Sequence, residues 1–339
     1  MIQLPKWRKA GAAFALCAVA FAQSGPRSWN ERRERIIEGI QDVMGPLPSG
    51  PLTPPEVIIV ERAEFPKFVR QKITFDSGDG DSVPAYLFLP VGRRRRRPAV
   101  LCLHQTTKIG KDEPAGLGGK ENLHYAIELA ELGFVAMAPD YPGYGEYSID
   151  SYAMGYASAT MKGIRNHRRA VDLLTSMPEV DPGRIGVIGH SLGGHNALFL
   201  AAFEPRIAAV VTSCGFTSFR KYKGGDLTGW SHRGYMPRIA SDYWNSPELM
   251  PFDFSDVLGV IAPRPIFINA PVFDANFDWS GVDDSVRAAQ AIYLKEFHVR
   301  NGLRVVHPDS AHDFPSDIRS KAYSFLARAL ARRYDETAK

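Results

Sequence analysis

The sequence has few cysteines, and its histidines follow no metal-binding pattern. Three of the 339 residues are cysteine. Cys17 lies in an N-terminal segment that we expect to be removed. Cys102 and Cys214 belong to apolar runs typical of buried strands, where a free cysteine behaves as a small hydrophobic residue. A disulfide between these two cysteines is the alternative, which the sequence alone does not decide. His190 and His195 are five residues apart, which is not a zinc-ligand spacing. We therefore expect no metal site.

Excess charge is also small. The 41 lysines and arginines exceed the 37 acidic residues only slightly, which gives a net charge of +4. Residues 93–97 form a run of five arginines directly before a predicted strand. A short run of this kind in a nearly neutral chain is typical of a solvated turn. We expect no nucleic-acid partner.

Long apolar runs are missing as well. The N-terminal run at residues 10–21 is shorter than the roughly 20 residues that span a bilayer. It follows the basic segment 1–9 and ends in Ala20-Phe21-Ala22, which fits a signal-peptidase site. We predict a signal peptide over residues 1–22, export to the periplasm or out of the cell, and no stable membrane insertion after cleavage.

The sequence does contain a glycine-flanked serine between a strand pattern and a helix pattern. Residues 184–188 are apolar and partly β-branched after Arg184, which predicts a short buried strand. Gly189-His190-Ser191-Leu192-Gly193 then matches G-x-S-x-G, and residues 196–202 predict a helix. In this setting the serine lies on a sharp, strained turn, and larger flanking residues would collide with the strand or the helix.

The remaining chain has the pattern of an α/β protein. Residues 29–44 predict an amphipathic helix, and residues 68–75 and 83–89 predict an antiparallel hairpin. From residue 99 onward strand and helix patterns alternate, and no glycine-rich phosphate loop follows a strand. This alternation predicts a mostly parallel sheet with helices on both faces and no cofactor.

We divide the chain into a signal peptide (1–22), an N-terminal helix with a proline-rich arm (23–67) and a catalytic domain (68–339). Within this domain, residues 215–263 interrupt the alternation between two predicted strands and are rich in glycine, tryptophan and tyrosine. We expect this insertion to lie over the carboxyl edge of the sheet, where open α/β folds bind ligands.

A serine nucleophile needs a base that takes its proton and an acid that orients the base. In this architecture the acid and then the histidine follow the serine along the chain, each after a later strand. Asp274 lies closest to the end of the predicted strand 266–269, so we prefer it to Asp278. We prefer His312 to His307, because a loop residue can reach over the sheet edge.

The developing oxyanion needs hydrogen-bond donors. One is the backbone N–H of Leu192, directly after the serine. We expect the second from the loop after the first parallel strand, with Thr106 as first choice and Gln105 as second.

These motifs resemble the α/β-hydrolase superfamily, in the neighbourhood of dienelactone-hydrolase-like and acetylxylan-esterase-like enzymes. The resemblance covers residues 68–333 and rests on the glycine–serine motif, on Ala262-Pro263-Arg264-Pro265 and on the His312 loop. It implies the α/β-hydrolase fold and a serine esterase whose acid follows its strand by a few residues, which again selects Asp274. Where the family's strand usually ends in His-Gly, this chain has Gln105.

The favoured function is an exported serine hydrolase that cleaves carboxylic esters, including acyl esters on carbohydrates, through an acyl-enzyme. Its partner would be a small or polysaccharide-linked ester. A prolyl-oligopeptidase-like peptidase and an inactive binding module are the alternatives. Trp230 and Tyr235 of the insertion would stack on a sugar or an aromatic acyl group, or would simply attach the insertion to the core.

Overall fold

The computed structural model describes residues 28–49, 53–92 and 96–331; the predicted signal peptide lies outside the described residues. A nine-stranded sheet forms the centre, in the order β1-β2-β3-β5-β4-β6-β7-β8-β9. The pairs from β1 to β5 are antiparallel, and the pairs from β5 through β4 to β9 are parallel. The strands are β1 (Val57–Glu64), β2 (Phe68–Asp76), β3 (Ser82–Pro90), β4 (Arg97–Leu103), β5 (Val135–Pro139), β6 (Val180–His190), β7 (Ile207–Ser213), β8 (Ile266–Asn269) and β9 (Leu303–Val306).

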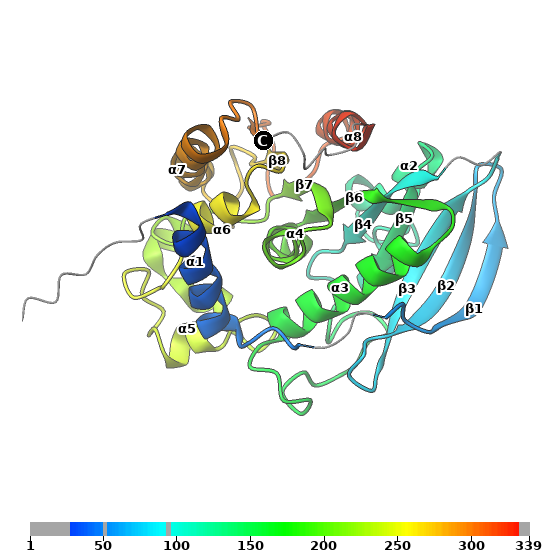
Figure 1. The fold of residues 1–339 in the computed structure, drawn as a ribbon, viewed down its shortest axis with the longest axis horizontal. Coiled ribbons are helices and arrows are strands. Elements are labelled where there is room, and N and C mark those ends of the chain that lie inside the picture. The colour runs from blue at the N-terminus through cyan, green and yellow to red at the C-terminus, as the bar shows by residue number, and fades with distance from the viewer. Residues whose placement is uncertain (1–27, 50–52, 93–95, 332–339) are drawn as a thin grey trace, which may run out of the picture.

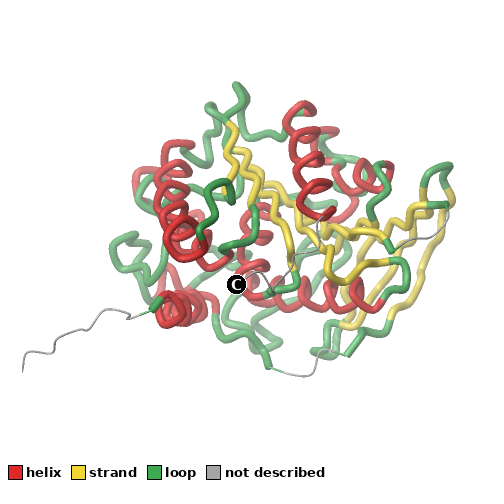
Figure 2. The backbone as a smooth tube through the Cα atoms, turned by 45° about the horizontal axis from the view of Figure 1, so that its top comes forward, coloured by secondary structure: helices red, strands yellow, loops and turns green. Residues whose placement is uncertain are grey.

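Helices cover both faces of this sheet (Figures 1 and 2). The helices α1, α3, α4 and α6 share one hydrophobic cluster with the sheet, and α2 and α8 belong to a second cluster on the other face. The predicted α/β-hydrolase architecture is confirmed. The helices are α1 (Trp29–Met44), α2 (Tyr125–Glu131), α3 (Ala159–Ser176), α4 (Leu192–Phe203), α5 (Arg238–Ser241), α6 (Phe254–Ile261), α7 (Trp279–Phe297) and α8 (Ser316–Ala331). Of the helices in the described ranges, none has the length and apolar character needed to span a membrane.

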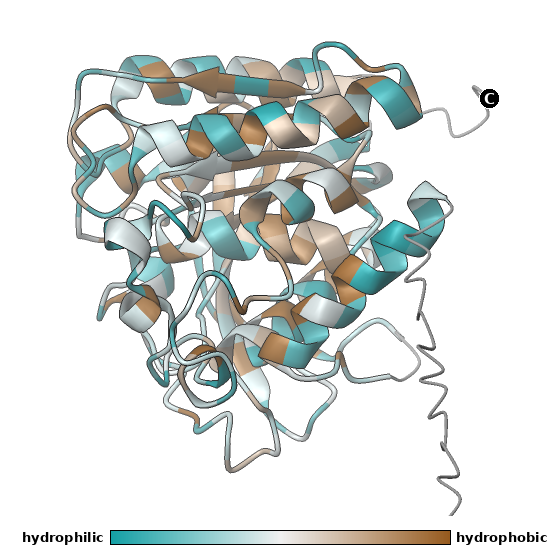
Figure 3. Ribbon diagram, turned by 90° about the vertical axis from the view of Figure 1, so that its left-hand side faces the viewer, coloured by the Kyte–Doolittle hydropathy of each residue, from teal (hydrophilic) through white to brown (hydrophobic). Residues whose placement is uncertain are grey.

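The first helix shows how local sequence and packing agree. Ser28 and Glu31 form a reciprocal capping box that satisfies two free N–H groups at the start of α1. Ile40, Val43 and Met44 are fully buried on its inner face. In Figure 3 the hydrophobic residues of the outer helices likewise occupy only part of each helix surface.

The central strands are buried on both faces. Every residue of β5 and β8, and residues 99–103 of β4, are buried. Strands covered by helices on both sides have continuous apolar runs rather than alternation. This is why these strands were recognisable in the sequence.

Two features differ from the sequence-based expectation. Residues 57–64, expected in the arm, form β1 at the sheet edge, where Val57, Ile58, Ile59 and Val60 are 38–65% exposed. Their exposure removes the in–out alternation by which a half-buried strand is recognised. Cys214 is not a strand residue: it follows β7 with a φ of 48°, and both it and Cys102 are free cysteines.

The insertion between β7 and β8 adds aromatic residues to the hydrophobic cluster that α4 shares with the sheet. Phe219, Phe252 and Phe254 pack against one another and against Phe199 of α4, with ring centroids 5.4–6.2 Å apart. Arg264, directly after the insertion, donates to the backbone carbonyls of Ala201 in α4, Glu204 after α4 and Ile207 at the start of β7. The insertion is therefore fixed against α4 and the sheet edge.

A buried ion cluster joins the turn between β2 and β3 to α3. The Lys162 side chain is fully buried, and its Nζ lies 2.9 Å from an Asp79 oxygen and 2.8 Å from an Asp81 oxygen. Tyr156 donates a hydrogen bond to Asp79, and Tyr147 donates one to Asp81. Each carboxylate thus depends on the same buried ammonium group.

Replacing Lys162 by methionine should lower the free energy of unfolding by about 3–5 kcal/mol, because it removes the buried cation that two partly buried carboxylates share. Urea denaturation followed by circular dichroism measures the loss. The matched control is Lys321→Met, whose exposed pair with Asp317 should contribute about 0.5 kcal/mol or less. Equal losses in the two variants would show that the cluster does not anchor the turn.

Candidate active site

Ser191 occupies a strained turn between β6 and α4. Its φ of 53° lies in the left-handed region, and its N–H donates to the Ser213 carbonyl over 2.8 Å. A Cβ at Gly189 would collide with the carbonyl of Gly193, and a Cβ at Gly193 would collide with the carbonyl of Leu103. The two glycines allow the first turn of α4 to approach the strand ends, and this approach sets the position of the serine.

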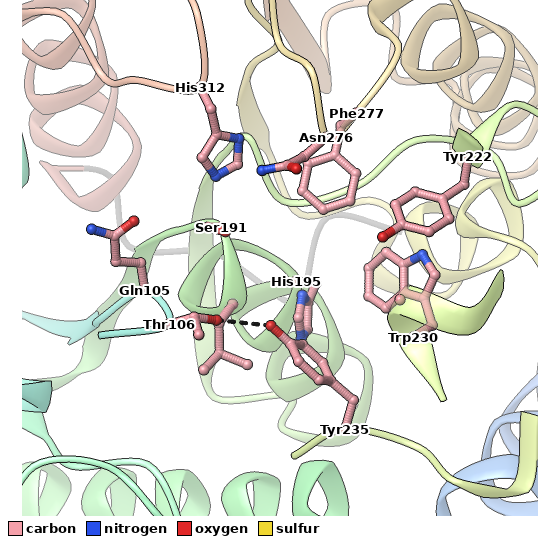
Figure 4. A pocket seen from close by; sticks show the side chains of 12 residues that line it. Gln105, Thr106, Ser191, His195, Tyr222, Trp230, Tyr235, Asn276, Phe277 and His312 are labelled. Carbon is pink, nitrogen blue, oxygen red and sulfur yellow. Dashed lines mark hydrogen bonds between the residues drawn. The ribbon is translucent and has the colours of Figure 1, made fainter. Parts of the chain in front are cut away.

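Asp274 and His312 form a hydrogen-bonded pair beside this turn. His312 Nδ1 lies 2.9 and 3.0 Å from the two carboxylate oxygens of Asp274. The Asp274 side chain is 1% exposed and also accepts hydrogen bonds from the backbone N–H groups of Asn276 and Phe277. The opposite edge of the imidazole points towards Ser191 (Figure 4).

The loops that carry Asp274 and His312 are bonded to each other. The N–H groups of Val272 and Phe273, after β8, donate to carbonyls of the loop after β9. The Asn269 amide donates to the Ser213 hydroxyl and to the Asp313 carbonyl, each over 2.9 Å. The histidine loop is thus bonded to the ends of both β7 and β8.

The two alternative triad residues lie in different environments. Asp278 is the N-terminal cap of α7 and accepts from the Ser280 N–H over 2.8 Å. His307 pairs with Asp283 over 3.0 Å and with the Ala270 carbonyl. Neither residue lines the cavity next to Ser191.

A cavity of about 260 Å³ opens next to Ser191. Its wall combines residues of the sheet-end loops with residues of the insertion (Figure 4). The lining residues are Gln105, Thr106, Ser191, Leu192, His195, Tyr222, Gly229, Trp230, Tyr235, Asn276, Phe277 and His312.

Thr106, Gln105 and Leu192 all lie at this cavity, as the sequence predicted for the oxyanion donors. Leu192 is the first residue of α4, so its N–H has no partner within the helix. The Gln105 side-chain amide donates to Glu113 over 3.0 Å, and the Gln105 carbonyl lies 2.6 Å from His104 Nδ1. The Thr106 hydroxyl lies 2.8 Å from the Tyr235 hydroxyl.

The expected stacking of a substrate ring on Trp230 is wrong. Trp230 is 2% exposed, because its ring packs against aromatic neighbours that include Phe219, Phe254 and Phe277. These contacts agree with the alternative interpretation, in which the Trp230 ring attaches the insertion to the core. Tyr235 remains at the cavity wall and contacts His195.

Sequence reasoning missed five wall residues: His195, Tyr222, Gly229, Asn276 and Phe277. A signal existed for three of them. His195 lies one helical turn after Ser191, and Asn276 and Phe277 follow the preferred acid within the same loop. The position of Tyr222 depends on how the insertion folds, which its sequence pattern does not specify.

Two buried histidines flank Ser191 in sequence. Burial lowers the pKa of His195 to about 3 and lowers the pKa of His190 well below its usual value, an effect to which nearby His312 contributes. Both imidazoles are therefore neutral near pH 7. The His190 ring centroid lies 4.8 Å from that of His312, and His190 Nδ1 lies 2.9 Å from the Ser213 hydroxyl.

His190, Cys214 and His312 each offer a possible metal ligand, and these atoms lie within 4.8 Å of one another. Burial raises the pKa of the Cys214 thiol well above its usual value, so the thiol stays protonated. A metal binds the thiolate form of cysteine, so a metal at these three residues would have to displace the Cys214 proton. The absence of a metal requirement stays a prediction.

The chain has the α/β-hydrolase fold, and a carboxylate–histidine pair beside a serine on a strained turn is the arrangement found in serine ester hydrolases. Residues 83–223 match the model of the dienelactone hydrolase family. The resemblance seen in the sequence is thereby confirmed.

Individual known proteins are similar over longer stretches. The YtaP protein of Bacillus subtilis (strain 168) is 27% identical over 315 residues, which cover 88% of this chain and 99% of that protein. The 4-O-methyl-glucuronoyl methylesterase of Hypocrea jecorina is 26% identical over 209 residues, 56% of this chain and 44% of that enzyme. Among solved structures, a glucuronoyl esterase from Solibacter usitatus superposes with a TM-score of 0.69 at 17% identity, covering 88% of this chain and 92% of the other.

Replacing Asp274 by asparagine should lower kcat by about 10⁴, the loss seen when the acid of a comparable triad is replaced. Asp278→Asn is the matched control and should leave kcat within about twofold, because asparagine caps a helix as well as aspartate does. Steady-state hydrolysis of p-nitrophenyl acetate measures both. A larger loss in Asp278→Asn would identify Asp278 as the acid partner of the histidine.

Proposed function

We propose that the protein hydrolyses acyl esters of carbohydrates through a Ser191–His312–Asp274 triad. The observation that carries this proposal is the buried Asp274–His312 pair, whose free imidazole edge faces Ser191 in a cavity of substrate size. The same pair would serve a prolyl-oligopeptidase-like peptidase, so the choice of esters rests on the similar enzymes. An inactive binding module would have no use for the pair.

The reaction has two steps. Neutral His312 accepts the Ser191 proton as the hydroxyl oxygen attacks the ester carbonyl, and the resulting imidazolium then protonates the leaving alcohol. In the second step His312 takes a proton from water, the hydroxide attacks the acyl-enzyme, and the acid product leaves as Ser191 recovers its proton. Asp274 holds Nδ1–H and stabilises the imidazolium in both steps.

The oxyanion of each tetrahedral intermediate would be held by backbone donors. The Leu192 N–H at the start of α4 is the first, and the positive end of the helix dipole reinforces it. We assign the second to the backbone N–H of Thr106, because the Gln105 side-chain amide is engaged by Glu113. Removing one such donor typically costs about 10²–10³ in kcat.

The carbohydrate assignment rests on the similar enzymes and on the predicted export. The names of the similar enzymes include an acetyl xylan esterase, in which the sugar carries the acyl group, and glucuronoyl esterases, in which the sugar is the acid part of the ester. Export through the predicted signal peptide 1–22 would bring the enzyme to polysaccharides outside the cell. The catalytic domain would begin at residue 68, with residues 215–263 shaping the substrate site.

Replacing Ser191 by alanine should lower ester turnover by about 10⁶ without unfolding the protein, since the triad nucleophile is lost. Acetylated xylosides, p-nitrophenyl acetate and an aminoacyl anilide serve as substrates, and Ser320→Ala on the exposed face of α8 is the control. Turnover within tenfold of the parent would refute the triad. Preferential cleavage of the anilide would instead favour the peptidase.

The kcat/KM of the native enzyme should be low in acid and rise with pH, because the mechanism needs a neutral imidazole to accept the serine proton. His190 and His195 should not contribute to the rise, since burial keeps them neutral well into the acid range. A pH profile with and without a chelator tests this, with His307→Ala as a control that should retain the profile. Chelator inhibition reversed by a divalent ion would contradict the serine mechanism.

A further inference from the structure

The loop after β4 brings one peptide unit to the cavity, the unit between Gln105 and Thr106. Both residues line the cavity next to Ser191 (Figure 4). Within the described ranges of the chain, the Thr106 N–H donates to no other residue. This N–H is therefore available to an oxyanion, and the way the peptide unit is held decides where the N–H points.

A buried imidazole holds the carbonyl of this peptide unit. His104 is 2% exposed, its Nε2 lies 2.9 Å from the Tyr141 backbone nitrogen, and its Nδ1 lies 2.6 Å from the Gln105 carbonyl oxygen. Because a backbone N–H can only donate, Nε2 is the accepting nitrogen, and the proton of the neutral ring is on Nδ1. Burial lowers the pKa of His104, so the ring stays neutral near pH 7. Nδ1–H thus donates to the Gln105 carbonyl.

The planarity of the peptide bond transmits this orientation to the donor. The Gln105–Thr106 peptide is trans, and in a planar trans peptide the C=O and the N–H point in opposite directions. With the Gln105 carbonyl turned towards His104, the Thr106 N–H points away from the imidazole. Among the described residues His104 does not line the cavity, whereas Gln105 and Thr106 do. The hydrogen bond is therefore made on the side away from the cavity.

Side-chain contacts hold the same peptide unit at both ends. The Gln105 amide donates to Glu113 over 3.0 Å, and Glu113 is itself 2% exposed. The Thr106 hydroxyl lies 2.8 Å from the Tyr235 hydroxyl. These two contacts limit the movement of the loop, but neither reaches the Gln105 carbonyl. The rotation of the peptide unit depends on the bond from His104.

We propose that His104 is a positioning residue, which directs the Thr106 N–H at the oxyanion by holding the Gln105 carbonyl. This inference rests on the proposed esterase function and identifies the residue that orients its second oxyanion donor. His104 acts through the peptide unit and not on the substrate.

Two carboxamide variants separate the two hydrogen bonds of the ring. In His104→Gln the longer side chain brings its amide oxygen to the place of Nε2, where it can accept from Tyr141, but the donor to Gln105 is lost. In His104→Asn the amide nitrogen takes the place of Nδ1 and keeps that donor. Each variant retains one hydrogen bond, so a merely structural role predicts similar effects of the two substitutions.

With p-nitrophenyl acetate, His104→Gln should lower kcat by about 10–10², because removing an oxyanion donor costs about 10²–10³ and here the donor is misdirected. KM should change by less than about threefold. The inhibition constant of phenylboronic acid, whose tetrahedral adduct with serine resembles the transition state, should rise by a similar factor as kcat falls. In His104→Asn, kcat and the inhibition constant should return to within about threefold of the native values.

The outcomes separate this role from the esterase function. Equal losses of kcat in the two variants, a kcat of His104→Gln within twofold of the native value, or an unchanged inhibition constant in that variant overturns the positioning role and leaves the triad intact. A native enzyme that does not hydrolyse p-nitrophenyl acetate refutes the esterase itself.

The native protein decides the matter where a variant fails to fold. Nuclear magnetic resonance of the ¹⁵N-labelled enzyme at pH 7 should show His104 as the neutral Nδ1–H tautomer. Addition of phenylboronic acid should move the Thr106 amide proton downfield, because this proton then donates to the adduct. An Nε2–H tautomer, or a Thr106 amide that does not move, overturns the inference.

Discussion

The structure depends on one close approach of backbone to backbone. The first turn of α4 lies so near the ends of β4 and β6 that a side chain at Gly189 or Gly193 would overlap a carbonyl group. This proximity forces Ser191 into a left-handed conformation and exposes the N–H groups at the start of the helix. The energy of the strained residue is offset by the buried helix, whose residues from Leu192 to Ala202 are all inaccessible to solvent.

A second constraint connects the histidine to this turn. Asn269, at the end of β8, bonds both to Ser213 at the end of β7 and to the loop that carries His312. The Ser213 carbonyl also accepts the N–H of Ser191. Neighbouring parallel strands thus bring residues far apart in sequence to one edge, and an error in the register of β7 or β8 would separate the base from the nucleophile.

The parts of this arrangement that the sequence predicted are those with a local cause. The strands buried on both faces have continuous apolar runs, and the serine turn has its two glycines, so each could be recognised without tertiary information. The pairing of Asp274 with His312 could be anticipated only from chain order, because their contact depends on the loops after β8 and β9.

The rest had no local signal. β1 is exposed on both faces, so its sequence lacks the alternation of a half-buried strand. Trp230 is of a residue type that often stacks on sugars, but its ring packs against Phe254 and Phe277. Whether an aromatic ring faces solvent or other rings is decided by how the insertion folds. The hydrogen bonds of the His104 ring are likewise visible only once its neighbours are placed.

The position of the insertion within one continuous segment has an evolutionary consequence. Ser191, Asp274 and His312 follow the ends of sheet strands, whereas Tyr222, Trp230 and Tyr235 come from one segment between β7 and β8. Mutations in that segment can therefore change which ester is accepted while the reaction chemistry is inherited intact. Related proteins with this scaffold can therefore acquire new substrates through changes in a single segment of the chain.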